Sequence, residues 1–209
     1  LSFTFVMALF NRFLRTYGGD LAISAMGIFF SLDSLLFLPV LGLAEGVQPL
    51  IGYNYGARDY GRVISAVRSA MLLGLAFFAG SFLLIMTVPE PLIRIFNDND
   101  PALLALAVRG LRIGYSGVLF ASVSIIASHT FQAIGKPKKG IFLTLSRHFL
   151  FILVPLYFLP PLLGTDGVWL AIPLSDLGGG LLGAWFLKRE FALMRRDQQI
   201  DGMSPPPGP

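Results

Sequence analysis

The sequence contains no cysteine, and among its 209 residues there are only two histidines and twelve acidic residues. The absence of cysteine excludes disulfide frameworks, thiolate catalysis and cysteine-ligated zinc. So few histidines and acids also argue against a His-rich metal centre. The composition therefore argues against a function based on thiol redox chemistry or on zinc.

Charge is the second scarce property, since only 13% of the residues are charged, against about a quarter in an ordinary soluble domain. Hydrophobic residues make up 55% of the chain and include 19 Phe, and the mean hydropathy is +0.71. A single soluble core of this size does not bury so much apolar surface, and a disordered chain requires low hydrophobicity. The composition therefore predicts an all-α, polytopic integral membrane protein.

Apolar runs of about 20 residues, the length that crosses a bilayer, divide the chain into about six helices. We predict a partial span at 1–14 and complete spans at 21–52, 63–88, 103–131, 141–159 and 168–187. No secretory signal is visible. Because the chain begins at Leu1 inside an apolar stretch, we expect a piece of a longer protein that is cut inside a helix. Residues 1–196 form the predicted membrane domain, and the proline-rich segment 197–209 is predicted to be a disordered cytoplasmic tail.

The distribution of Lys and Arg predicts the orientation, since cytoplasmic connections carry an excess of both. With the predicted spans, eleven of the sixteen basic residues fall on one side, which includes Lys136, Arg147 and the C-terminal arginines. That side and the C-terminus are expected in the cytoplasm of a multi-pass cell membrane protein. The net charge of +4 is explained by this placement, so no nucleic-acid partner is expected.

Three carboxylates lie inside apolar runs, where a charge costs at least about 2.5–3.5 kcal/mol. They are Asp33, Glu45 and Asp176, and Gln48 shares a helix face with Glu45. Such residues face a cavity, hold a proton, bind a cation or satisfy freed backbone groups. We predict Asp33, Glu45, Gln48 and Asp176 as transport-cavity residues.

Prolines and glycines shape the predicted helices. Pro39, Pro155 and Pro173 lie within spans and are predicted to kink them. Close helix approach is predicted at the pairs Gly42/Gly46, Gly110/Gly114 and Gly179/Gly183. Asp100 before Pro101 is a predicted N-cap. No phosphate-binding glycine loop and no catalytic motif is visible, so neither an ATPase nor an enzyme is expected, and any transport draws on an ion gradient or another protein.

The stretch GLAEGVQPLIGYNYGA at 42–57 resembles the multidrug and toxic compound extrusion (MATE) family, at the end of its eighth helix. Three further pieces agree in order: 17–23, 131–138, and 166–169 with 173–176. The resemblance covers the chain to about Arg196. It implies one lobe, helices seven to twelve, of a twelve-helix antiporter that exchanges cationic amphipathic compounds for Na⁺ or H⁺ by alternating access.

The resemblance also implies partners: a missing N-terminal six-helix lobe, the lipid bilayer and cationic small-molecule substrates. In one branch of the family, acids on the helices matching 1–14 and 103–131 bind the cation, and both segments lack Asp and Glu here. The coupling-ion site is therefore unplaced, any metal site is unknown, and Na⁺ or H⁺ is expected as coupling ion without another cofactor.

Two alternatives remain open. A lipid-linked oligosaccharide flippase of the wider superfamily would need several cations deep in its cavity, and only Arg112 is expected there. A non-functional half-transporter remnant would also explain the apolar start.

Overall fold

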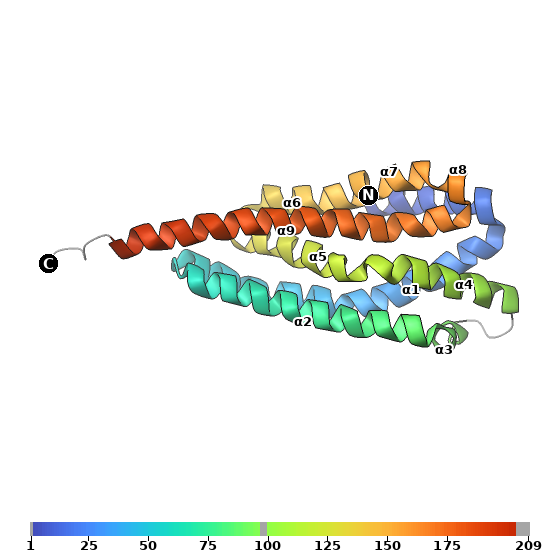
Figure 1. The fold of residues 1–209 in the computed structure, drawn as a ribbon, viewed down its shortest axis with the longest axis horizontal. Coiled ribbons are helices and arrows are strands. Elements are labelled where there is room, and N and C mark those ends of the chain that lie inside the picture. Colours follow the sequence, from blue (N-terminus) through green and yellow to red (C-terminus); the bar gives the residue numbers. More distant parts are fainter. Residues whose placement is uncertain (1, 97–99, 204–209) are drawn as a thin grey trace.

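The computed structural model describes residues 2–96 and 100–203, and every regular element within them is helical. Figure 1 shows an elongated bundle of helices that lie roughly along one axis. In chain order the elements are α1 Ser2–Gly56, α2 Tyr60–Thr87, α3 Pro89–Arg94, α4 Pro101–Gly114, η1 Tyr115–Gly117, α5 Val118–Ala133, α6 Pro137–Leu145, η2 Ser146–Leu150, α7 Phe151–Phe158, α8 Pro160–Leu163 and α9 Thr165–Met203.

Five helical segments within these residues are long and apolar enough to cross a membrane. They correspond to the spans predicted from the sequence, with the predicted spans 1–14 and 21–52 lying on the two sides of a kink within α1. The all-α membrane bundle is thus confirmed. It also agrees with the physical rule that a single helix satisfies its own backbone hydrogen bonds in lipid.

A sharp bend divides α1 at Gly19, which has a φ of 67° and a ψ of −165°. An L side chain rarely adopts this conformation, so glycine is the residue that permits the turn. The adjacent Gly18 packs against Thr165 and Ala22 without room for a β-carbon. The bend lies between the predicted spans 1–14 and 21–52. The remainder of α1, including Pro39, keeps helical backbone angles.

Side-chain caps begin two of the helices. Asp100 accepts hydrogen bonds from the backbone N–H groups of Ala102 (2.9 Å) and Leu103 (3.1 Å) at the start of α4, so the predicted cap is confirmed. Asp59 caps α2 in the same way by accepting from Arg62 N at 3.1 Å. Both caps satisfy donors that have no partner within their own helix.

Two spans predicted as single helices are interrupted. The span 103–131 is divided by the 3₁₀ turn η1, where Gly117 lies against Pro173 of α9. The span 141–159 begins earlier, at Pro137, and contains the π-helical segment η2 between α6 and α7. Sequence periodicity did not show either interruption, because both depend on which helices meet at that point.

The last helix is longer than predicted. α9 runs from Thr165 to Met203, whereas we predicted a span at 168–187 and a disordered tail from 197. Residues 197–203 are therefore helical, and the rest of the predicted tail lies outside the described residues. Pro173 is inside α9 and buried, while Pro155 lies near the end of α7.

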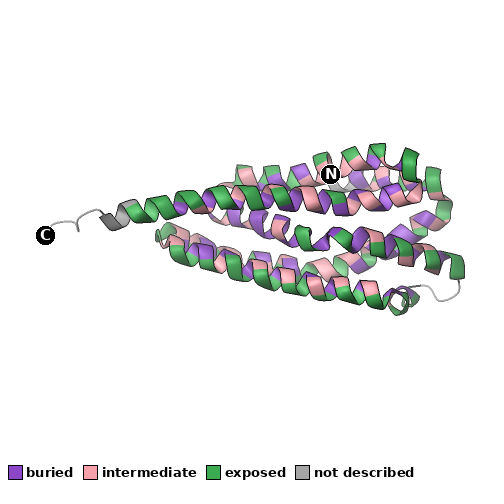
Figure 2. Cartoon of the chain, viewed as in Figure 1, coloured by how far each residue is buried: buried purple, intermediate pink, exposed green. Residues whose placement is uncertain are grey.

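The core lies between the helices, and large apolar side chains cover the outer surface. α5 is largely buried in the middle of the bundle, as Figure 2 shows. Trp169, Phe29 and Tyr115 pack edge to face with ring centroids 5.6–5.7 Å apart. Outward-facing Leu35, Leu72, Leu83, Tyr157 and Leu162 are each at least 60% exposed. In lipid, such exposure carries no hydrophobic penalty.

Candidate functional site

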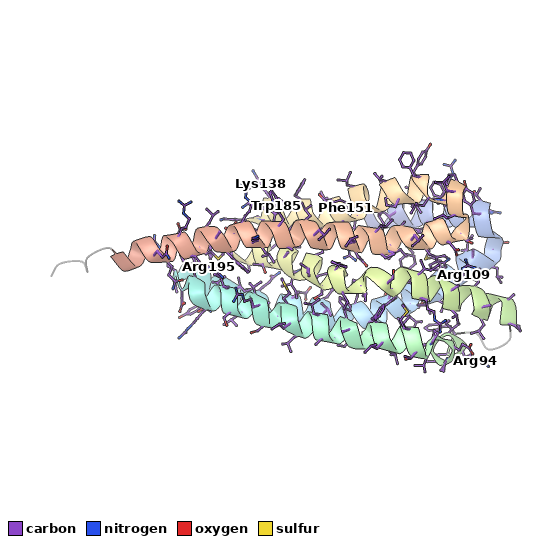
Figure 3. The ribbon with its side chains drawn as sticks, viewed as in Figure 1. Arg94, Arg109, Lys138, Phe151, Trp185 and Arg195 are labelled. Atoms are coloured by element: carbon purple, nitrogen blue, oxygen red, sulfur yellow. The ribbon has the colours of Figure 1, made fainter. Side chains whose placement is uncertain are left out.

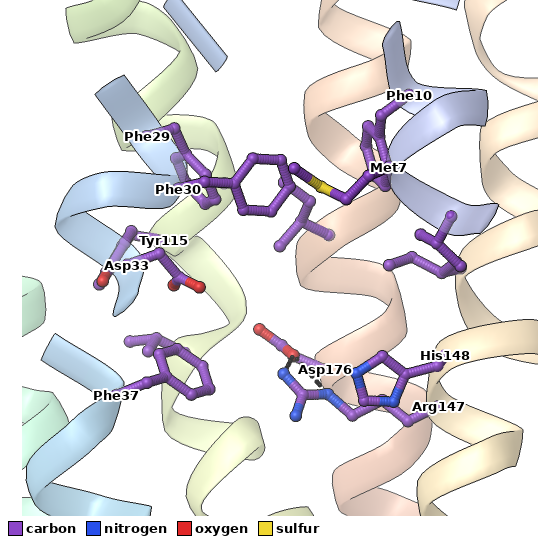
Figure 4. A pocket seen from close by; sticks show the side chains of 15 residues that line it. Met7, Phe10, Phe29, Phe30, Asp33, Phe37, Tyr115, Arg147, His148 and Asp176 are labelled. Atoms are coloured by element: carbon purple, nitrogen blue, oxygen red, sulfur yellow. Dashed lines mark hydrogen bonds and ion pairs between the residues drawn. The ribbon is translucent and has the colours of Figure 1, made fainter. Parts of the chain in front are cut away.

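A cavity of about 90 Å³ lies inside the bundle, lined by residues of α1, α4, η1, α5, η2, α7 and α9. Figure 4 shows its polar side chains on opposite walls: Asp33 and Tyr115 on one side, Arg147, His148 and Asp176 on the other. Phenylalanine rings surround this polar group, among them Phe10, Phe29, Phe30 and Phe37. Because a water needs about 10–15 Å³ of such space, the cavity is large enough for a small hydrated group.

An ion pair forms one wall of the cavity. The Arg147 guanidinium donates to Asp176 Oδ1 from Nη2 at 2.6 Å and from Nε at 3.1 Å. Both side chains are removed from the surface, with 17% and 4% of their areas exposed. The guanidinium also lies over the Phe37 ring, 5.6 Å from its centroid. A charge at this depth persists because its partner and the ring replace the lost hydration.

The π-helical segment η2 carries Arg147 to this position. It inserts extra backbone between α6 and α7 and presents Arg147 and His148 toward the cavity. Ser175 Oγ donates to the backbone carbonyl of Arg147 at 2.9 Å, which ties η2 to α9. Single-turn π segments occur often at functional sites, and here the segment places a guanidinium opposite Asp33.

The opposite wall combines a carboxylate with a phenol. Asp33 of α1 lines the cavity, and Figure 4 shows the Tyr115 side chain beside it. Tyr115 is 1% exposed, and its hydroxyl interacts with the Asp33 carboxylate on the same wall. A group that enters the cavity on this side therefore meets the carboxylate and the phenol together.

The cavity lining has one carboxyl group more than it has permanent cations. Its lining holds two carboxylates, Asp33 and Asp176, and one guanidinium, that of Arg147. His148 Nδ1 lies 2.9 Å from the Thr144 carbonyl, an acceptor, so this nitrogen carries the hydrogen. With Arg147 bonded to Asp176, the excess charge is at Asp33. An apolar enclosure around a net negative charge favours a proton or a small cation.

The structure brings together two of the four predicted cavity residues. Asp33 and Asp176 line the same cavity, whereas Glu45 and Gln48 do not. Glu45 is exposed and Gln48 is partly exposed on α1. They lie along a face of α1 whose glycines Gly42 and Gly46 have open space around them.

Sequence reasoning missed Arg147 and Tyr115. Arg147 was counted with the cytoplasmic basic residues, and only Arg112 was expected deep in a span. Instead, Arg147 lines the internal cavity, while Arg112 is exposed and donates to the Met86 carbonyl at 3.3 Å. The available signal was an Arg-His pair inside the apolar run 141–159, together with an Asp in the next span.

A second charged cluster joins the α5–α6 turn to α9. Glu190, only 2% exposed, pairs with Lys136 and with Lys139, the latter at 2.9 Å. Partial burial acts to lower the pKa of Lys136, but the hydrogen bond and charge of Glu190 outweigh it, so the pKa is raised above its usual 10.5. At the other end of the bundle Arg109 pairs with Asp166.

Comparison with known proteins decides the family. The MatE family model matches residues 1–158, which contain Asp33, Tyr115 and Arg147. The chain belongs to the MatE family.

Among curated relatives, the MatE chain is 29% identical over 158 residues to the multidrug export protein MepA of Staphylococcus saprophyticus. It is 27% identical over the same length to MepA of Staphylococcus aureus. In both cases the match covers 76% of this chain and 34% of the relative. The chain thus spans about a third of the length of the curated relatives that it matches.

Solved MATE transporters share the fold. An outward-facing multidrug resistance MATE transporter matches with a TM-score of 0.86 at 20% identity, covering 93% of this chain and 44% of that one. An inward-facing structure matches with a TM-score of 0.84 at 19% identity, covering 94% and 46%. These likenesses confirm a multi-pass MATE-type helical bundle for the chain.

Proposed function

We propose that this chain forms one lobe of an ion-coupled multidrug efflux antiporter. A second, N-terminal six-helix lobe would supply the other wall of a central cavity. The transporter would export cationic amphipathic compounds by alternating access, in exchange for Na⁺ or H⁺. The membership in MatE and the similarity to MepA support the drug-export part of this proposal.

The observation that carries the ion coupling is the excess carboxylate in the internal cavity. Arg147 already neutralises Asp176, so Asp33 is the group that would accept a proton or a cation. The Tyr115 hydroxyl on the same wall would supply a further oxygen to that ion. Loading and unloading Asp33 changes the charge of the cavity and would bias the lobe's pairing with its partner.

The lobe would move as a unit. Its fold resembles both an outward-facing and an inward-facing MATE structure with nearly equal TM-scores, 0.86 and 0.84. This supports rocking of one lobe against the other rather than internal rearrangement. The exposed face of α1 that bears Glu45 and Gln48 would then line the path of the exported cation. We place the protein in the cell membrane with its C-terminus in the cytoplasm, consistent with the basic α5–α6 turn.

The proposal is tested by dye export from cells that lack their own exporters. The two-lobed transporter should lower accumulation of a cationic dye such as ethidium, in response to an imposed Na⁺ or proton gradient. The Asp33→Asn variant removes the exchangeable charge without changing side-chain size, and should lose the response to the gradient.

Glu45→Gln is the matched control, since it makes the same chemical change on α1 outside the cavity. It should keep the gradient response, although the affinity for the dye can change. If the parent transporter exports no cationic dye, the multidrug assignment is wrong. Equal behaviour of the two variants would remove Asp33 from the coupling.

A flippase of the wider superfamily gains one supporting observation, because Arg147 is a cation within a span. Its charge is already balanced by Asp176, to which it donates two hydrogen bonds, so the pair offers phosphate no net positive charge. Reconstituted vesicles that move a fluorescent lipid-linked oligosaccharide, but no cationic dye, would favour the flippase.

A further inference from the structure

A second surface on this lobe, distinct from the internal cavity, combines exposed cations with exposed aromatic side chains. It lies where α6 and α9 run side by side in opposite directions (Figure 1). We call it the α6–α9 patch and define it by Leu145, Phe142 and Lys138 of α6 and Leu181, Trp185 and Arg189 of α9. Each of these residues is exposed.

Along both helices, the exposed side chains change from aliphatic to aromatic to cationic toward the end of the bundle that carries the α5–α6 turn. α6 presents Leu145, then Phe142, then Lys138, while α9 presents Leu181, then Trp185, then Arg189. Successive members are three or four residues apart, or about 4.5–6 Å at the helical rise. Aliphatic, aromatic and cationic groups therefore occupy three successive depths. This is the order in which a membrane presents acyl chains, interface and headgroups.

Packing between the helices holds the two series at matching depth. The Phe142 ring lies 6.1 Å from the ring of Phe186, which in turn lies 5.0 Å from Trp185. One turn further on, buried Glu190 bonds Lys136 and Lys139, which fixes the start of α6 against α9. Lys138 is exposed between those two lysines. Figure 3 labels Lys138 on α6 and Trp185 on α9.

On α9, the exposed aromatic ring and the exposed cation of the patch contact each other. The Arg189 guanidinium lies over the Trp185 indole, 4.9 Å from its centroid, and Trp185 is 50% exposed. Lys188 adds another exposed charge next to Arg189. The neighbouring acid, Glu190, forms its ion pairs with Lys136 and Lys139. The cationic level of the patch, Lys138 and Arg189, therefore has Lys188 as a further exposed cation beside it.

We propose that the α6–α9 patch binds an anionic phospholipid of the adjoining leaflet, with its phosphate between Lys138 and Arg189. Its acyl chains would lie along Phe142, Trp185, Leu145 and Leu181. Positive charge next to an anionic leaflet and an apolar surface directly beneath it are the two features that such a lipid complements. This inference is independent of ion coupling and drug export.

Trp185 supplies a direct test, because the chain contains only two tryptophans and the other, Trp169, is fully buried. The full chain is reconstituted into bilayers with equal mole fractions of brominated phosphatidylglycerol or brominated phosphatidylcholine, and tryptophan quenching is measured. We expect stronger quenching by the anionic lipid. The Trp185→Phe variant should lose this difference, which assigns the signal to the patch.

Charge-neutral variants then test the recognition. Each of Lys138→Gln and Arg189→Gln should lower the preference for the anionic lipid about five-fold. Arg15→Gln, the same change on an exposed arginine next to the Gly19 bend, should leave it unchanged. Equal quenching by the two lipids in the parent would overturn the proposal, as would a preference that survives the double variant. Loss of the preference on adding inorganic phosphate at constant ionic strength would instead indicate a soluble phosphate ligand.

Discussion

At the scale of single residues, the internal cavity depends on one ion pair within an apolar bundle. Asp176 is buried and Arg147 is mostly buried, and neither would keep its charge there alone. Each side chain replaces the hydration that the other has lost. The pair also determines which carboxylate is available in the cavity, because it occupies Asp176 and leaves Asp33.

Removal of one partner should therefore be costly. We expect Arg147→Met to lower the free energy of unfolding by about 3–5 kcal/mol, because Asp176 stays buried without a counter-charge. The double variant Arg147→Met/Asp176→Leu should recover most of this loss, since an apolar pair of similar volume needs no charge compensation. Denaturant unfolding in detergent measures both. If the double variant is no more stable than Arg147→Met, the loss of stability does not come from the unpaired Asp176 charge.

At the scale of helices, glycines act in two different ways. Gly117 lies where η1 meets α9, and a β-carbon there would lie 2.5 Å from Pro173 Cα. Gly42 lies within α1, and a β-carbon there meets nothing within 4 Å. The first glycine sets how closely two elements approach, and the second leaves a face of α1 open.

A matched pair of substitutions separates these roles. Gly117→Ala should destabilise the lobe by about 1–3 kcal/mol, because backbone on α9 must move. Gly42→Ala should be neutral, or stabilising by up to about 1 kcal/mol, because alanine favours the helix. Thermal unfolding of the two variants in the same detergent checks the difference. Equal changes in stability for the two variants would show that the close approach of Gly117 to Pro173 does not contribute to stability.

The Glu190 cluster links the α5–α6 turn to α9 and gives a pH dependence. The pKa of Lys136 is raised in the folded lobe, so its contribution to stability is complete below the unfolded value of 10.5 and is lost as pH rises through the folded pKa. We expect the stability gap between the parent and Lys136→Met to close above about pH 10.5. Unfolding measured from pH 8 to 12 tests this, and a gap that widens with pH would contradict it.

At the scale of the whole molecule, α5 lies at the centre and holds the neighbouring helices as one body. Ser128 of α5 donates to the Gly140 carbonyl at 3.0 Å and lies 2.8 Å from the Thr144 hydroxyl. No space for a β-carbon exists at Gly140, which lies against the Ser128 carbonyl. Such contacts leave α5 and α6 little freedom to separate.

A cross-link tests whether the lobe moves as a unit. Because the chain has no cysteine, Ser128→Cys/Thr144→Cys introduces the only thiols of this lobe, at side chains that already meet. If the lobes rock as rigid bodies, dye export by a transporter with an otherwise cysteine-free second lobe should survive oxidation. Export that stops on oxidation and returns with reductant would show that α5 and α6 must move apart during the cycle.

The sequence by itself determined the class of the protein. Its excess of apolar residues requires membrane spans, and only helices satisfy the backbone in lipid within one segment. The turn at Gly19 and the cap at Asp100 also follow from local chemistry, and the motif at 42–57 pointed to the family that the comparison confirms.

Only the tertiary structure decided the site. Arg147 and Asp176 are 29 residues apart in the chain, and they meet because a π-helical segment rotates one side chain toward α9. Glu45 and Asp33 are both acids within one helix, yet only Asp33 faces the cavity. Which face of a helix is enclosed depends on how the neighbouring helices pack against it. In a mostly apolar helix, few polar residues mark one face, so the sequence does not show which face points inward.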